Sequence, residues 1–227
     1  MCKEMTKNVK VVAFVPIKLN SERVPNKNIK AFTNGKPLIN YILNTALNVS
    51  NIGELYVYCS SERIQDYLPP HVKFLRRPEY LDLSSTGILE VIKCFTETIP
   101  ADIYALLHAT APFVKAETIE IGVSAVSSGN FDSAFPVTAN HEFLWVDGNP
   151  NYDTRNIPRT QDLKPFYIET SGFFIFTNEL ARKKRRIGDN PFLIEVSKIE
   201  ATDIDNPIDF EIADAIYNFI IKGRMEQ

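Results

Sequence analysis

Blocks of apolar and polar residues alternate along the chain, and their periods predict strands and helices in turn. Residues 11–15 form a continuous apolar run, typical of a parallel strand covered on both faces, so we expect a strand over about 9–16. Residues 37–49 carry apolar side chains at helical spacing, behind a proline that suits the first turn of a helix. Further strands are predicted over 55–60, 72–75, 102–107, 132–137, 166–176 and 192–196. Further helices are predicted over 61–67, 86–98, 115–128, 178–184 and 207–222.

This alternation is the pattern of βαβ units, which build a parallel sheet with helices on its faces. The 227 residues show no internal repeat and are enough for one sizeable domain. We therefore predict an α/β fold with one mostly parallel, Rossmann-like sheet.

The alternation stops after Val137. Residues 138–165 are rich in Asn, Asp and Pro and contain the only tryptophan, Trp145. Within them, Asp147-Gly148 predicts the turn of a short hairpin. A segment of this length with little regular structure is usually functional. From the residues alone, a local flap and a dimerisation arm both stay open.

Charge and cysteine content narrow the class of protein. The formal net charge of −3 argues against a general nucleic-acid-binding protein, which is normally basic. Residues 1–8 lack the apolar core of a signal peptide, and no apolar run approaches the roughly 20 residues of a membrane span. Cys2, Cys59 and Cys94 are unevenly spaced and fit reduced thiols of a cytoplasmic protein. We expect no nucleic-acid partner and no membrane association.

A polar, basic loop follows the first predicted strand. It carries three cations, Lys18, Arg23 and Lys27, with the hydroxyl of Ser21 and the amide of Asn28. Open α/β sheets bind ligands at the carboxyl ends of their strands, and this set of donors suits a polyphosphate. The loop has neither a Walker A sequence nor a G-x-G-x-x-G fingerprint, so side chains must hold much of the phosphate charge. A basic surface loop without a ligand is the alternative.

Two aspartates precede the last predicted helix. Side chains at positions i and i+2 of an extended segment point the same way, so Asp203 and Asp205 can face one site. One or two carboxylates, completed by substrate phosphates, form a typical Mg²⁺ site. The alternative is helix capping, which accounts for Asn206, Pro207 and Asp209 but leaves Asp203 and Asp205 unexplained.

These motifs together resemble the acylneuraminate (CMP-sialic acid type) cytidylyltransferases, within the sugar nucleotidyltransferases. The resemblance rests on S-x-R-x-P-x-K-N at 21–28, G-K-P-L at 35–38 and D-I-D at 203–205, and it extends from Val9 to about Phe219. It implies a three-layer α/β/α sandwich, with one nucleotidyltransferase domain over 1–227 and an insertion at 139–168 for dimerisation and the sugar pocket. It further implies a homodimeric enzyme that uses CTP, Mg²⁺ and a nonulosonic, sialic-acid-like sugar acid to form a CMP-sugar and pyrophosphate.

The resemblance also implies roles for single residues. Arg23, Lys27, Asp203 and Asp205 are implied as catalytic, with the two aspartates as metal ligands. The implied nucleotide-binding residues are Lys18, Ser21, Arg23, Lys27, Asn28, Ser85 and Thr86. The implied sugar-binding residues are His108, Thr110, Gln161 and Ser171. Helix capping is the alternative for Ser85 and Thr86, and a buried or capping histidine is the alternative for His108.

The chain departs from the family pattern at several positions. Lys18 replaces Arg, Glu22 replaces Lys, Ser84 replaces Asp and His108 replaces Gln. These replacements keep two alternatives open. One is a nucleotidyltransferase for another sugar, such as a Kdo-like acid, and the other is a catalytically impaired nucleotide-binding protein on the same fold.

Five consecutive cations occupy residues 182–186, at the end of a predicted helix. Positive charge suits the carboxyl end of a helix dipole, so we interpret this run as a solvated helix end. A nucleic-acid or targeting role is the alternative.

Overall fold

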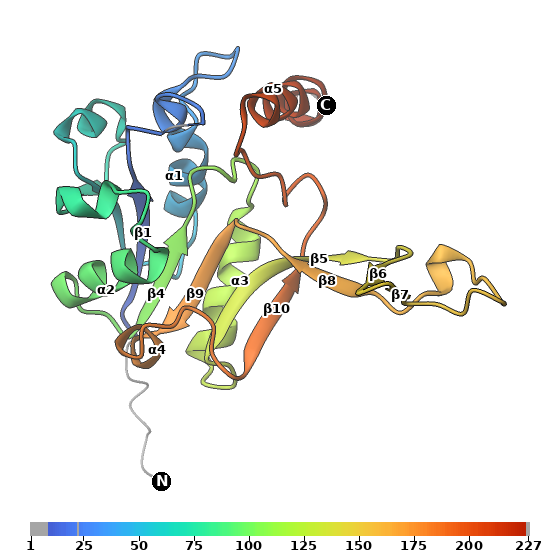
Figure 1. The fold of residues 1–227 in the computed structure, drawn as a ribbon. Coiled ribbons are helices and arrows are strands. Elements are labelled where there is room, and N and C mark those ends of the chain that lie inside the picture. The colour runs from blue at the N-terminus through green and yellow to red at the C-terminus, as the bar shows by residue number, and fades with distance from the viewer. Residues whose placement is uncertain (1–8, 22, 226–227) are drawn as a thin grey trace, which may run out of the picture.

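The computed structural model describes residues 9–21 and 23–225, which form a three-layer α/β structure around one sheet (Figure 1). The eight-stranded sheet has the order β10-β5-β9-β4-β1-β2-β3, with β8 paired to β5 beside this path. Its parallel half consists of β1 (Val11–Ile17), β2 (Glu54–Cys59), β3 (Val72–Arg76) and β4 (Ile103–Leu107). The other half consists of β5 (Ser133–Asn140), β8 (Phe166–Glu169), β9 (Phe173–Thr177) and β10 (Pro191–Glu195). The predicted α/β class is confirmed.

Helices cover both faces of the sheet because the buried strands are apolar on both sides. Along β1, Val11, Ala13 and Val15 pack into one core cluster, while Val12 and Phe14 pack into another. The first cluster lies under α1 (Ile39–Leu47) and α3 (Ala116–Ser127). The second lies under α2 (Ile88–Thr98) and α4 (Asn178–Arg182). Short 3-10 helices span Lys27–Ile29, Glu62–Tyr67, Glu79–Asp82 and Thr160–Asp162. Within residues 9–21 and 23–225, no helix is both long and apolar enough to cross a membrane.

The C-terminal helix begins with the cap that the sequence predicts. In α5 (Pro207–Ile216), the carboxylate of Asp209 accepts the backbone N–H groups of Asp205 (3.0 Å) and Asn206 (2.7 Å). The single helix predicted over 207–222 is interrupted, since a π-helical turn at Tyr217–Ile221 joins α5 to α6 (Lys222–Met225). The cap fixes the chain directly after the D-I-D segment.

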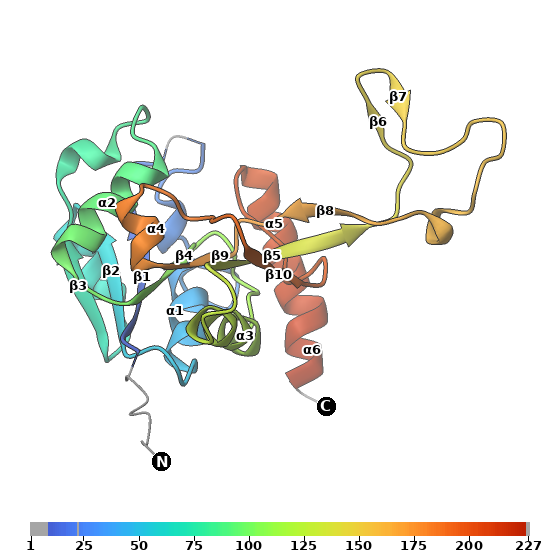
Figure 2. The same cartoon turned by 90° about the horizontal axis from the view of Figure 1, so that it is seen from below.

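An arm projects from the sheet between β5 and β8 (Figures 1 and 2). It contains the predicted hairpin, formed by β6 (Trp145–Val146) and β7 (Asn149–Pro150). Asp147 and Gly148 both have positive φ, at 50° and 77°, as a type I′ turn requires. The hairpin prediction is therefore confirmed.

The single strand predicted over 166–176 is wrong. The structure has two strands, β8 and β9, separated at residues 170–172. β8 pairs with the last residues of β5, whereas β9 enters the sheet between β5 and β4. At the break, both the backbone N–H and the hydroxyl of Thr170 donate to the carbonyl of Pro136, at 3.0 and 3.2 Å. β5 pairs with both segments, and the break separates β8 from the segment that has β4 as a second partner.

Candidate active site

A cavity of about 510 Å³ opens at the carboxyl ends of β1 and β4. The chain runs from β1 outward to β2 and β3, then returns to place β4 on the other side of β1. The cavity therefore lies where the strand order reverses, which is the usual ligand position in open α/β sheets. Most of the predicted site residues line it, namely Lys18, Ser21, Arg23, Lys27, Asn28, Thr86, His108 and Thr110.

The first loop holds its shape through two asparagines. Asn26 adopts the left-handed conformation (φ 54°), which asparagine tolerates better than most residues, and a 3-10 turn follows it directly. The side-chain amide of Asn28 donates to the carbonyl of Lys18 at 3.1 Å and closes the loop. Val24 is buried and anchors the loop. Arg23 and Lys27, on either side of Val24 in the loop, line the cavity.

Lys27 is a lysine withdrawn from solvent, with only 8% of its surface exposed. Its Nζ donates to the carbonyl of Ile204 at 2.5 Å and lies 3.9 Å from Oδ1 of Asp205. Burial lowers the pKa of Lys27, and the carboxylates of Asp205 and Asp203 act in the opposite direction. Lys27 thus joins the first loop to the D-I-D segment at the cavity.

The D-I-D segment separates its apolar side chain from its carboxylates. Ile204 is fully buried in a cluster with Phe210 of α5, and its N–H donates to the carbonyl of Thr110 at 2.9 Å. Oδ1 of Asp205 accepts a hydrogen bond from Arg23 at 2.9 Å. Oδ1 of Asp203 is buried and has no hydrogen-bond partner within the described part of the chain. Helix capping occupies Asp209 and leaves these two carboxylates for another role.

The two carboxylates fit a Mg²⁺ site that a substrate completes. Among the described residues, no group of three or more His, Cys, Asp or Glu side chains is placed to hold a metal ion. A site on Asp203 and Asp205 would need further oxygen ligands, which phosphates and water typically supply to Mg²⁺. The unpartnered oxygen of Asp203 supports this fit.

Arg77 is a cavity residue to which the sequence analysis gave no role. Its side chain is only 4% exposed, and its Nε donates to Oδ1 of Asp82 at 2.8 Å, with a second contact from its terminal nitrogen. Asp82 also accepts the hydroxyl of Ser60 at 2.5 Å, and its carbonyl lies 3.5 Å from Nζ of Lys18. The signal was the position of Arg77 two residues after the strand predicted over 72–75, at the carboxyl edge of the sheet.

Helix capping by Ser85 and Thr86 is not observed. The residue before α2 is Gly87, and no side chain caps this helix. Thr86 lines the cavity and donates its hydroxyl to the carbonyl of Tyr80 at 2.9 Å. Ser85 does not line the cavity.

His108 follows β4 and contributes a neutral imidazole to the cavity. Its Nε2 is buried without a hydrogen-bond partner in the described residues. Burial and, to a smaller extent, the positive charge of Arg186 lower the pKa of His108 to about 4. At neutral pH the ring therefore offers one donor and one acceptor, rather than a positive charge.

Two predicted sugar-binding residues lie away from this cavity. Gln161 is exposed in the 3-10 helix of the arm, and Ser171 lies at the break between β8 and β9. Neither lines the cavity of this chain. The replacement at Glu22 lies outside the described residues.

Fold and site together define an α/β protein with a cationic cavity at the edge of its sheet, which suits an anionic ligand. Lys18, Arg23, Lys27 and Arg77 line the cavity, and the carboxylate of Asp205 contacts Arg23 and Lys27. A sequence model of the cytidylyltransferase family matches residues 12–165, and the chain belongs to this family.

Named relatives cover most of this chain at modest identity. N-acylneuraminate cytidylyltransferase A of Danio rerio is 24% identical over 90% of this chain and 50% of its own length. CMP-N,N'-diacetyllegionaminic acid synthase of Legionella pneumophila is 26% identical over 92% of this chain and 96% of its own length. Pseudaminic acid cytidylyltransferase of Campylobacter jejuni is 24% identical, with coverages of 92% and 97%. The chain thus spans half of the first relative and nearly all of the other two.

Solved structures share the fold. CMP:2-keto-3-deoxy-manno-octonic acid synthetase, solved with CTP, has a TM-score of 0.67 at 15% identity and covers 91% of this chain and 98% of its own. 4-Diphosphocytidyl-2C-methyl-D-erythritol synthase from Anaerococcus prevotii has a TM-score of 0.64 at 11% identity, with coverages of 94% and 98%. At these identities the likeness concerns the fold alone.

The lowered pKa of His108 predicts a specific dependence of the unfolding free energy on pH. Its folded-state pKa of about 4 lies below the ordinary 6.5, so protonation between these values favours the unfolded chain. Compared with a His108→Gln variant, the wild type should lose up to about 3 kcal/mol of unfolding free energy as pH falls from 7 to 4. Urea unfolding across this range measures the difference. Parallel pH profiles for the two proteins would show that His108 titrates normally.

Proposed function

We propose that this protein transfers the cytidylyl group of CTP to a nonulosonic, sialic-acid-like sugar acid and releases pyrophosphate. The observation that carries the proposal is the contact of Lys27 with the D-I-D segment. This contact holds the D-I-D segment against the cationic loop that lines the cavity. Family membership supports the cytidylyl transfer, and the named products of the relatives support the class of sugar.

The reaction requires positioning and charge neutralisation rather than a protein nucleophile. The anomeric hydroxyl attacks the α-phosphorus, one phosphorus–oxygen bond forms, the bond to the β-phosphate breaks, and a proton is released. Arg23 and Lys27 would neutralise the phosphate charge that builds up, while Ser21 and Asn28 shape the loop that holds them. Arg77 is paired with Asp82, so we assign it to positioning the wall of the cavity.

Asp203 and Asp205 would hold Mg²⁺ together with phosphate oxygens of CTP. A bound Mg²⁺ would neutralise phosphate charge and lower the pKa of the attacking hydroxyl. Arg23 pairs with Asp205 at 2.9 Å. We therefore expect Arg23 to exchange this carboxylate for the phosphates when the substrate binds.

The central test is pyrophosphate release with CTP, Mg²⁺ and a panel of acids: N-acetylneuraminic, diacetyllegionaminic, pseudaminic and Kdo. We expect release with at least one nine-carbon acid. Asp203→Asn and Asp205→Asn should each lower kcat by about 100-fold or more, because they remove charge that the transition state requires. Asp66→Asn, at an exposed position away from the cavity, is the matched control and should leave the rate unchanged.

Different outcomes of this test contradict different parts of the proposal. No release with any acid would contradict cytidylyl transfer, and a preference for Kdo would move the substrate class to the eight-carbon acids. Full activity in both aspartate variants would contradict the metal site while leaving the reaction in place.

We also propose that the arm mediates a homodimer. The arm exposes large apolar side chains, including Trp145, Val146 and Ile157, at 57%, 57% and 65%. Such exposure is typical of an interface. Sedimentation equilibrium at micromolar concentration should give twice the chain mass, and Trp145→Asp should shift it toward the monomer. A monomeric wild type would contradict the proposal.

The division into one domain with an insertion at 139–168 and the cytoplasmic location stay predictions.

A further inference from the structure

Arg186 is half-buried. This position disagrees with the interpretation of residues 182–186 as a solvated helix end. Its side chain is 25% exposed, and its guanidinium carbon lies 3.7 Å from the centre of the buried Phe174 ring. Burial lowers the pKa of Arg186, and the neighbouring carboxylate of Glu169 opposes this effect. The interpretation is therefore wrong for Arg186, although Arg182, Lys183 and Lys184 are exposed.

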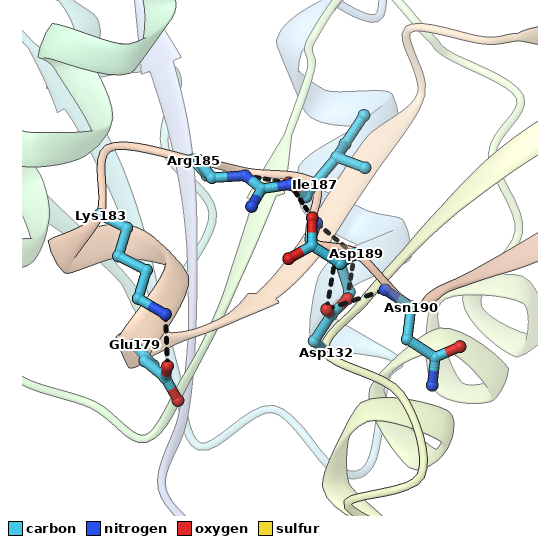
Figure 3. A network of polar contacts seen from close by, with 9 residues as sticks. Asp132, Glu179, Lys183, Arg185, Ile187, Asp189 and Asn190 are labelled. Carbon is cyan, nitrogen blue, oxygen red and sulfur yellow. Dashed lines mark hydrogen bonds and ion pairs between the residues drawn. The ribbon is translucent and has the colours of Figure 1, made fainter.

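A polar network fixes the loop on the C-terminal side of Arg186 (Figure 3). Arg185 donates to the carbonyl of Ile187 at 3.1 Å and pairs with Asp189 at 2.7 Å. The carboxylate of Asp132, directly before β5, accepts the N–H groups of Asp189 and Asn190 at 2.8 and 3.0 Å. Because these bonds tie the loop to the sheet, Arg186 is carried on a fixed backbone rather than on a free helix end.

Arg186 and His108 lie around the same aromatic ring. The centres of the His108 and Phe174 rings are 6.0 Å apart, and Nε2 of His108 is buried without a partner in the described residues. Within the same residues, the guanidinium of Arg186 has one hydrogen-bond partner, Glu169, at 3.1 Å. A guanidinium has five N–H donors, so it retains the capacity to bind a second anion. His108 lines the cavity and Arg186 does not, but the charge of Arg186 acts on His108, so the guanidinium lies behind this part of the cavity lining.

We propose that Arg186 is a specificity-determining residue that binds the carboxylate of the sugar acid, in place of or together with Glu169. This inference rests on the proposed function, which requires an anionic sugar. The first-loop cations are assigned to the triphosphate, and Arg77 is neutralised by Asp82. A partly desolvated guanidinium is well suited to a carboxylate, which it can bind through two parallel hydrogen bonds. Glu169 is 43% exposed and can give way to the substrate.

Two substitutions test the inference because they should act in opposite directions. Arg186→Gln should raise KM for the preferred sugar acid by about 10-fold or more while leaving KM for CTP within about 2-fold. Glu169→Gln removes the competing carboxylate and should lower KM for the sugar acid. Arg186→Lys should restore part of the affinity. Arg182→Gln, an exposed cation in the same run, is the matched control and should behave as the wild type.

A second substrate separates carboxylate binding from a structural role. The wild type should strongly prefer the best acid of the panel over its primary carboxamide, and Arg186→Gln should largely lose this preference. Equal losses with acid and carboxamide, or a raised KM in Glu169→Gln, would overturn the inference while wild-type activity upholds the proposed function. A wild type that releases no pyrophosphate with any acid would instead overturn the proposed function, and this inference with it.

Discussion

The burial of Lys27 is the constraint on which the site depends. An ammonium group removed from water costs several kcal/mol unless partners replace its hydration. Here the partners are the carbonyl of Ile204 and the carboxylate of Asp205, at a separation of 177 residues between Lys27 and Ile204. The first loop and the C-terminal segment therefore hold each other in place. Neither forms this wall of the cavity alone.

The positive charges in and around the cavity form two groups, and under the proposed function we expect these groups to order the substrates. The first loop carries Arg23 and Lys27, which we propose for the triphosphate, and Arg23 pairs with Asp205. His108 stays neutral at neutral pH, and the positive charge nearby belongs to Arg186. A sugar acid placed between them would present its hydroxyl toward the phosphates and its carboxylate toward the guanidinium.

The sequence predicted those features that depend on local pattern. Residues 11–15 are buried on both faces whichever strands they pair with, and the Asp147-Gly148 turn is encoded by two residues. The break at 170–172 was missed because it depends on where β4 joins β9 as a second partner beside β5, which hydrophobic periodicity does not record. The roles of Arg77 and Arg186 were missed for a related reason. Sequence analysis treats a cationic residue as exposed to solvent, whereas the burial of these two side chains depends on residues from other segments.

The most direct measurement of the central claim is CTP binding by isothermal titration calorimetry in the presence of Mg²⁺. The wild type should bind one CTP per chain, and Lys27→Met should weaken binding by about 30-fold, or about 2 kcal/mol, while keeping its fold by circular dichroism. Lys73→Met, at an exposed lysine of β3, is the matched control and should bind as the wild type does. Equal CTP affinity in Lys27→Met and the wild type would contradict the account, because the buried lysine would then have no part in holding the nucleotide.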